Sequence, residues 1–179
     1  VVESKGFDSV WVGDSLFSKP RYEPLSLLAA ISQRTQRVKL GTACMVTPTR
    51  NPLYLALEWA TLDQISGGRT ILGACMGNPE HGVRREYAAL GLDFKKRAGI
   101  FEEGLSILRD LWMDGKTNFR GDHFNYDDIS FYSGTEMGPL MPQQTPPIWI
   151  VSNPRLVVGT KEEDRVATVI SKAARRIAK

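Results

Sequence analysis

The sequence has few of the residues on which metal sites and nucleophilic catalysis depend. It contains two histidines, His81 and His123, and two cysteines, Cys44 and Cys75, among 179 residues. These are too few for a zinc-type ligand cluster, so we expect no metal site. Each cysteine comes at the end of a predicted buried strand, which favours free thiols over a disulfide.

Long runs of one residue type are also missing. The net charge is +3, and no basic run is longer than Lys95-Lys96-Arg97, so nucleic acid is not an expected partner. No apolar run is as long as a membrane span and no signal peptide is visible, so we expect no membrane partner and a cytoplasmic location. A chain that is 42% hydrophobic and 24% charged can form one sizeable globular core.

The clearest pattern that is present runs from Arg37 to Asn78. A strand that ends in small residues, RVKLGTACM, precedes a helix that begins at Pro52 and ends at Gly67, and a second strand, RTILGACM, follows. A strand, a helix and a strand with short joints predict a βαβ unit, from which parallel sheets are built.

The rest of the chain continues this alternation. Strands are predicted at residues 8–13, 38–45, 70–76 and 147–151, with helical segments between them. They should be parallel and adjacent in sequential order, with right-handed crossovers. This α/β pattern fits half of a (β/α)8 barrel or a small doubly wound sheet. The segment 118–146, with a hairpin turning near residues 120–122, is a long insertion in either fold.

Both ends of the sequence lack elements that a closed sheet needs. Residues 1–6 have the pattern of a helix tail capped by Gly6, and the helical region 156–179 has no strand after it. We therefore expect the sequence to be part of a longer chain, with structure missing at both ends.

Several residues near the predicted strand ends are candidates for a ligand site. Gly73 and Gly77 leave room for a flat ligand against the backbone, but they could equally relieve crowding or mark a bulge. Asp14 could take a polar role in the site or cap the following loop. His81 could contact substrate or be solvated. The Arg84-Arg85 pair could meet a phosphate or a polyanionic cofactor tail, or form an exposed face.

Six segments, in order, resemble the luciferase-like monooxygenase family, which contains bacterial luciferases, flavin-dependent monooxygenases and F420-dependent reductases and dehydrogenases. They are GFDSVWVGD, LGTACMVTPTRNP, LDQISGGR, LGACMGN, FEEGLSILRDLW and PPIWIVSNP. The resemblance implies a (β/α)8 TIM barrel with an insertion. Residues 1–179 would then be a single incomplete domain that holds strands two to five, with the insertion at about 118–146.

The resemblance also implies where a cofactor lies. In the family the flat ring rests against a bulge in the third strand that contains a non-prolyl cis peptide, which would be Ala43–Cys44 here. The phosphate lies by the ends of the fourth and fifth strands, where backbone N–H groups suit an anion. The implied cofactor-binding residues are Thr42, Ala43, Cys44, Met76, Gly77, Asn78, Ser152 and Asn153. Asp14 is the candidate catalytic residue, at the reactive face.

The sequence departs from the family pattern at three positions. Ser15 follows Asp14, where luciferases and several F420 enzymes have a histidine. Asn78 stands where F420-dependent sugar phosphate dehydrogenases have a glutamate, so the acid–base pair of those enzymes is absent. Met76 stands where luciferase has a basic residue, so a phosphate contact from that side chain is absent too.

The expected function is a flavin-dependent oxidoreductase or monooxygenase that acts on a small organic substrate. The cofactor would be FMN, or reduced FMN delivered by a separate flavin reductase, and the flavin would carry the chemistry. The reaction would be oxygen insertion or hydride transfer. One alternative is an F420-dependent reductase or dehydrogenase, and another is a non-catalytic flavin-binding or structural relative. Family resemblance implies a homodimer in the full-length form.

Overall fold

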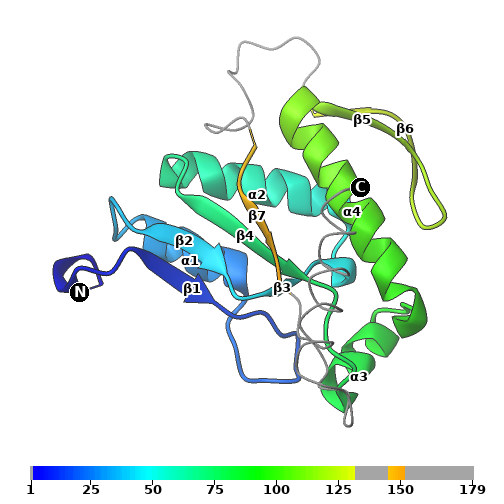
Figure 1. The fold of residues 1–179 in the computed structure, drawn as a ribbon, viewed down its shortest axis with the longest axis horizontal. Helices are drawn as coiled ribbons and strands as arrows, with labels where there is room; N and C mark the ends of the chain where they lie inside the picture. The colour runs from blue at the N-terminus through cyan, green and yellow to red at the C-terminus, as the bar shows by residue number, and fades with distance from the viewer. Residues whose placement is uncertain (1, 132–144, 152–179) are drawn as a thin grey trace, which may run out of the picture.

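The computed structural model describes residues 2–131 and 145–151, which are built around a curved parallel sheet (Figure 1). Its strands are β1 (Ser9–Val12), β2 (Lys39–Thr42), β3 (Met45–Val46), β4 (Thr70–Cys75) and β7 (Ile148–Ile150). β1 pairs with β2, β2 and β3 both pair with β4, and β7 pairs with β4, and every pair is parallel. The predicted strand positions and the predicted parallel, sequential order are confirmed.

The third segment of the predicted sheet is one strand interrupted by a bulge. Leu40 pairs with Thr70 before the interruption, and Met45 pairs with Ala74 after it. The offset between partners therefore falls from 30 to 29, so one extra residue is accommodated between β2 and β3. The predicted strand over 38–45 is thus two short strands, separated by the bulge that the family resemblance implies in the third strand.

The helices begin and end at residues that favour those positions. α1 (Pro24–Ser32) and α2 (Pro52–Ser66) each start at a proline, after Glu23 and Asn51, whose side chains accept hydrogen bonds from backbone N–H groups of the first turn. α3 (His81–Ala89) follows β4, and α4 (Arg97–Asp114) is the longest helix described. Short 3-10 helices lie at Glu3–Lys5 (η1), Thr47–Thr49 (η2) and Phe94–Lys96 (η3).

The main core lies between the sheet and the helices α2 and α4. Leu72 of β4 packs there with Trp59 of α2 and Leu108 of α4, all nearly or fully buried. The indole nitrogen of Trp112 donates a hydrogen bond of 3.0 Å to the carbonyl of Ala56, which joins the two helices directly. A smaller cluster, Leu28, Val38, Leu40 and Leu62, seals α1 against the sheet. These clusters hold the strand ends, and hence the candidate site, in place.

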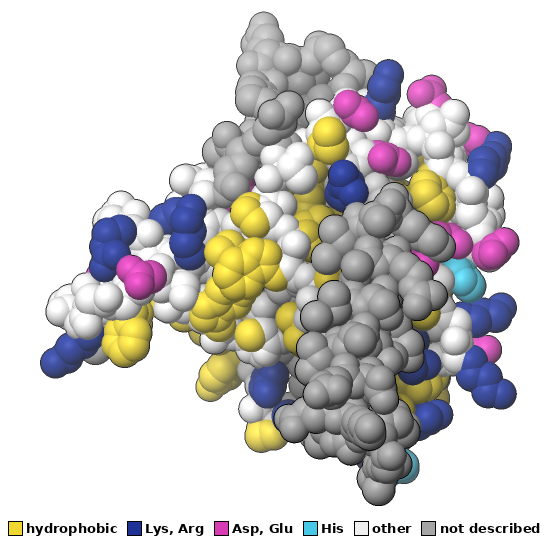
Figure 2. All heavy atoms as spheres, viewed as in Figure 1, with side chains coloured by type: hydrophobic (Ala, Val, Ile, Leu, Met, Phe, Trp, Pro, Cys, Tyr) yellow, Lys and Arg dark blue, Asp and Glu magenta, His cyan; other side chains and the backbone are white. Residues whose placement is uncertain are grey.

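The opposite face of the sheet is the concave face. Trp11 of β1 and Trp149 of β7 stack there, with ring centroids 5.1 Å apart, although β2 and β4 separate their strands. The Trp11 ring lies where a Cβ at Gly41 would stand, so glycine at 41 makes the stack possible. Figure 2 shows hydrophobic side chains gathered over the strands on this face. A sheet curved enough to bring its outer strands together has the geometry of a barrel segment.

A β-hairpin follows α4, as predicted. β5 (Lys116–Arg120) and β6 (Asn125–Ser130) are antiparallel, and they lie beside α4 in Figure 1. The Glu103 carboxylate accepts hydrogen bonds from the backbone N–H groups of Asp122, His123 and Phe124, so α4 holds the turn. Residues 132–144 of the predicted insertion and the predicted helical region 156–179 lie outside the described residues.

Within residues 2–131 and 145–151, none of the helices combines the length and the apolar character that crossing a membrane requires.

Candidate functional site

The candidate site lies at the carboxyl edge of the sheet, where β1, β2 and β4 end. The peptide bond between Ala43 and Cys44 is cis, as the sequence resemblance implied. The Ala43 backbone N–H donates to the carbonyl of Val12 at 2.7 Å, which ties the bulge to the end of β1. The side chain of Ala43 is exposed and that of Cys44 is half-buried. The bulge therefore offers a small, accessible surface at the edge where parallel sheets hold ligands.

Thr42 and Gly73 fix the bulge from the β4 side. The Thr42 hydroxyl donates to the Gly73 carbonyl at 2.9 Å and accepts from the Gly73 N–H at 3.1 Å. A Cβ at Gly73 would overlap the backbone carbonyl oxygen of Thr42. Of the two sequence interpretations of Gly73, relief of crowding at a bulge is the one that this contact explains. The whole Thr42 residue is fully buried, so it holds the bulge in place and offers no exposed surface to a cofactor.

Asp14 is held by a partner that the sequence analysis missed, Arg50. The two guanidinium N–H groups of Arg50 donate to the two carboxylate oxygens of Asp14 at 2.6 and 2.9 Å. The Val46 backbone N–H donates to the same carboxylate at 2.9 Å. Burial by itself lowers the pKa of Arg50, but the hydrogen bonds and charge of Asp14 outweigh it and raise that pKa. Asp14 is thus a nearly buried bridge between β1, β3 and the start of α2, rather than a cap of its own loop.

Glu86 of α3 holds the loop after Asp14. One carboxylate oxygen of Glu86 accepts hydrogen bonds from the hydroxyls of Ser15 and Ser18 and from the backbone N–H groups of Phe17 and Ser18, at 2.6–3.0 Å. Burial raises the pKa of Glu86, but these hydrogen bonds outweigh it and leave that pKa below its ordinary range. Ser15, in the place of the family's histidine, is therefore a structural link to α3.

The two cysteines face each other across the bulge as free thiols. A hydrogen bond from the Cys75 thiol lowers the pKa of Cys44. The same hydrogen bond raises the pKa of Cys75, and burial raises it further. The guanidinium of Arg21 lies where a Cβ at Gly13 would stand, and its charge also lowers the pKa of Cys44. A thiol of increased acidity and an arginine therefore lie at the same edge as the exposed Ala43.

The end of β4 turns away from the sheet at Met76, Gly77 and Asn78. The Tyr87 hydroxyl donates to the Met76 carbonyl at 2.9 Å, which fixes this turn to α3. Gly77 has a φ of +74°, and a Cβ there would contact Val83 and Val46. A valine at position 77 would consequently strain the fold itself, whatever binds nearby. Among the implied cofactor residues, Ala43 is therefore a better position than Gly77 for a substitution that tests whether a bulky side chain blocks the cofactor.

Two implied cofactor residues, Ser152 and Asn153, lie outside the described residues. The others, Thr42, Ala43, Cys44, Met76, Gly77 and Asn78, lie on adjacent strand ends, and their contact with a cofactor stays a prediction. Within the described ranges, no group of three or more His, Cys, Asp or Glu side chains could hold a metal ion.

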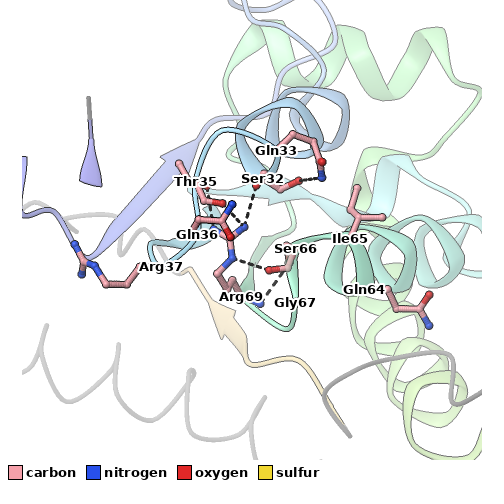
Figure 3. Close-up of a pocket in the computed structure, with 10 residues that line it drawn as sticks. All are labelled: Ser32, Gln33, Thr35, Gln36, Arg37, Gln64, Ile65, Ser66, Gly67 and Arg69. Atoms are coloured by element: carbon pink, nitrogen blue, oxygen red, sulfur yellow. Dashed lines mark hydrogen bonds between the residues drawn. The ribbon is translucent and has the colours of Figure 1, made fainter. Parts of the chain in front are cut away.

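The structure also forms a polar hollow of about 670 Å³, at the opposite edge of the sheet (Figure 3). It is lined by the ends of α1 and α2 and by the residues that precede β2 and β4. The Arg69 guanidinium is buried there and donates to the carbonyls of Ser32, Thr35, Val38 and Ser66. Arg69 thus satisfies backbone acceptors at the ends of two helices, which is a structural role.

The residues missed by sequence reasoning, Arg50, Glu86 and Arg21, act through tertiary contacts. Arg50 ends the TPTR loop, and only the fold shows that it faces Asp14. Glu86 is a charged side chain that is 2% exposed. Its position on the inner side of a short amphipathic helix was the only available signal.

The chain is similar to proteins of one family. The sequence profile of that family, described as Luciferase-like monooxygenase, matches residues 1–156. The chain is 34% identical over 161 residues to an F420-dependent glucose-6-phosphate dehydrogenase from Amycolatopsis mediterranei, covering 84% of this chain and 44% of that protein.

Two solved structures share the fold. A monooxygenase from Streptomyces bottropensis has a TM-score of 0.73 at 23% identity, and the match covers 98% of this chain and 56% of that one. An F420-dependent secondary alcohol dehydrogenase, solved with an F420-acetone adduct, has a TM-score of 0.65 at 25% identity, covering 83% and 44%. The predicted partial barrel is confirmed, and the chain spans about half the length of the relatives that it matches.

Proposed function

The chain belongs to the luciferase-like monooxygenase family, and from this premise we propose that the full-length protein is an F420-dependent oxidoreductase. The observation that carries the proposal is the identity of 32–34% to proteins named F420-dependent glucose-6-phosphate dehydrogenase. The monooxygenase structure, at 23% identity, supports the fold alone. The relatives thus favour F420. The sequence alone favours FMN as the first expectation.

The carboxyl edge fits a flat cofactor ring. Ala43 is exposed on the bulge, and Cys44 beside it is small and half-buried, so a ring can lie close to the backbone at these two residues. When bound, F420 supplies hydride donor and acceptor chemistry. The chain itself positions the ring. Asp14 and Arg50 hold Val46, and Thr42 holds Gly73, so the surface of the bulge under the ring, which we call the wall, is rigid.

Asp14 takes a positioning role in this proposal. Its carboxylate already accepts two hydrogen bonds from Arg50 and one from Val46. Both oxygens of this carboxylate are thus occupied by donors that hold the bulge in place. We therefore assign Asp14 to the geometry of the bulge rather than to proton transfer.

The sugar phosphate of the named relatives is not carried over to this chain. The Ser15 hydroxyl is hydrogen-bonded to Glu86, and Asn78 replaces the acidic residue that the family pattern has in sugar phosphate dehydrogenases. The proposed substrate is a small organic molecule that exchanges a hydride with the ring. The departure at Asn78 favours the second candidate, an FMN-dependent monooxygenase supplied by a flavin reductase.

A pair of matched variants tests the site. In the full-length protein, Ala43→Leu places a bulky side chain on the proposed wall, whereas Ala30→Leu adds the same side chain to the exposed surface of α1. We expect Ala43→Leu to weaken F420 binding by tenfold or more, about 1.4 kcal/mol, and Ala30→Leu to leave it unchanged. Unchanged binding by Ala43→Leu, with the far-ultraviolet circular dichroism of the wild type, would contradict the placement of the ring.

A further inference from the structure

Arg21 lies on the loop that joins β1 to α1, and its guanidinium packs against the backbone at the end of β1. The guanidinium occupies the place where a Cβ at Gly13 would stand, so glycine at position 13 makes this contact possible. The pKa of Cys44 is lowered by the hydrogen bond from Cys75, which is the largest cause, and also by the positive charge of Arg21. The charge of Arg21 therefore acts on the bulge, at the edge where Ala43 is exposed.

The loop that carries Arg21 is fixed at both ends. After β1, the Glu86 carboxylate accepts hydrogen bonds from the first residues of the loop. Before α1, the Glu23 carboxylate accepts a hydrogen bond of 2.7 Å from a backbone N–H of the helix and pairs with Arg50 at 3.6 Å. In Figure 1 the loop extends from the end of β1 towards α3. An arginine on a loop held in this way loses little backbone freedom when it binds a ligand.

The guanidinium of Arg21 has no acidic partner in the part of the chain that the structure describes. It forms no ion pair and no hydrogen bond there. The carboxylate of Asp14, which follows Gly13, is already occupied by Arg50 and by the Val46 N–H. Because Arg21 is exposed, its guanidinium N–H donors are available to a ligand that carries an anionic group.

The position of Arg21 separates it from the implied phosphate site of the cofactor. That site lies at the ends of β4 and β7, whereas Arg21 is at the end of β1, and β2 lies between β1 and β4. A ring that rests on the bulge has its phosphate end on the β4 side and Arg21 on the β1 side. We therefore assign an anion at Arg21 to the molecule that reacts with the ring.

We propose that Arg21 binds a carboxylate of the substrate, so that the full-length protein acts on a small organic acid. The inference rests on the proposed function and adds a substrate class to it. A guanidinium presents paired N–H donors whose spacing matches the two oxygens of a carboxylate. An acid bound in this way lies beside Ala43 and Cys44, next to the wall on which we place the ring.

Alkylation of Cys44 by a charged and by an uncharged reagent tests the carboxylate site. With iodoacetate and with iodoacetamide alike, the Cys44 sulfur displaces iodide from the methylene carbon and a C–S bond forms. Only iodoacetate carries a carboxylate that Arg21 can hold. In the full-length protein at low salt, we expect the ratio of the iodoacetate rate to the iodoacetamide rate at Cys44 to be about fivefold lower in Arg21→Gln than in the wild type. The ratio cancels any change in the pKa of Cys44, because both reagents react with the same thiolate.

The control variant is Lys19→Gln, which removes another exposed cation from the same loop and should keep the wild-type ratio. In the wild type, propionate should slow the alkylation of Cys44, and propionamide at the same concentration and ionic strength should not. An unchanged ratio in Arg21→Gln, or equal effects of propionate and propionamide, would overturn the carboxylate site while the proposed function stands.

Titration with F420 separates substrate binding from cofactor binding. We expect Arg21→Gln to bind F420 as tightly as the wild type does. A tenfold loss of F420 affinity in this variant would assign Arg21 to the cofactor and overturn the proposal. If the wild type does not bind F420, the proposed function fails and the substrate assignment fails with it, even where the alkylation ratio depends on Arg21.

Discussion

Asp14 and Arg50 are joined by two hydrogen bonds, of 2.6 and 2.9 Å, that connect the end of β1 to the start of α2. The same carboxylate accepts from the Val46 N–H, on the far side of the bulge. The Asp14 side chain is 6% exposed and the Arg50 side chain 21%. One nearly buried ion pair thus fixes three segments of the chain around the proposed ring-binding wall.

Replacing Asp14 by Asn should destabilise the fold. The change removes the charge that pairs with Arg50 at 2.6 Å and leaves the partly buried guanidinium with the more distant Glu23, at 3.6 Å, as its ionic partner. Loss of a charged hydrogen bond typically costs about 1.5–3 kcal/mol, so we expect a fall of about 2 kcal/mol in the free energy of unfolding. The matched control is Asp8→Asn, because the Asp8–Arg37 pair is 3.8 Å apart and Asp8 is 97% exposed. Equal effects of the two substitutions, measured by urea unfolding, would contradict the structural role of Asp14.

Glu86 should make stability depend on pH in the acidic range. Its folded pKa lies below the ordinary value of 4.5 because of the hydrogen bonds from the loop. Its stabilisation is therefore complete above pH 4.5 and is lost as the pH falls through the folded pKa. In Glu86→Gln, the unfolding free energy should be about 1.5–3 kcal/mol lower at neutral pH, with a smaller deficit as the pH is lowered.

The control for Glu86→Gln is Glu80→Gln, at the exposed start of the same helix, where the side chain makes no capping hydrogen bond. We expect it to change stability by less than about 0.5 kcal/mol. A Glu86→Gln deficit that is the same at pH 3 as at pH 7 would show that ionisation of Glu86 does not hold the loop.

Two Gly→Ala substitutions should have opposite effects. At Gly73 the new methyl group meets the backbone carbonyl of Thr42, whereas at Gly104, in α4, nothing lies within 4 Å. Gly73→Ala should destabilise the protein by about 3 kcal/mol, at the upper end of overpacking costs, because backbone cannot move aside. Gly104→Ala should stabilise it by about 0.5–1 kcal/mol through helix propensity. Thermal unfolding of both variants measures the two changes in stability. A Gly73→Ala protein as stable as the wild type would rule out the close approach of Gly73 to the Thr42 carbonyl.

Cys44 should react faster than Cys75 with iodoacetamide. The Cys75 thiol donates a hydrogen bond that lowers the pKa of Cys44, whereas the pKa of Cys75 is raised. The thiolate is the reactive form, so mass spectrometry of partially alkylated protein should find Cys44 modified first. In Cys75→Ala the donor is lost, and the rate at Cys44 should fall at pH 7.5. Preferential modification of Cys75 would contradict the assignment of Cys44 as the thiol with the lower pKa.

Much of the fold could be predicted from the sequence because it depends on local patterns. Alternating strands and helices, with proline at helix starts and glycine at helix ends, give the order of β1, β2, β4 and β7. The hairpin at 116–130 follows from its turn residues. The cis bond at Ala43–Cys44 was accessible only through family resemblance, since no local pattern in the sequence specifies it.

The contacts that shape the site could not be read from local patterns. Arg50 and Glu86 act on residues 36 and 68–71 positions away. The split of the third strand depends on the Thr42–Gly73 contact, and the concave face depends on Trp11 lying over Gly41. Each of these requires the folded arrangement of strands, which residue type and spacing alone do not specify.

The central claim is that the full-length protein uses F420, and side-by-side titration of the wild type with F420 and FMN tests it most directly. We expect F420 to bind with a dissociation constant at least tenfold lower than that of FMN, and FMN to be displaced by F420. Tighter binding of FMN, or a flavin spectrum in the purified protein, would contradict the claim and favour the monooxygenase alternative.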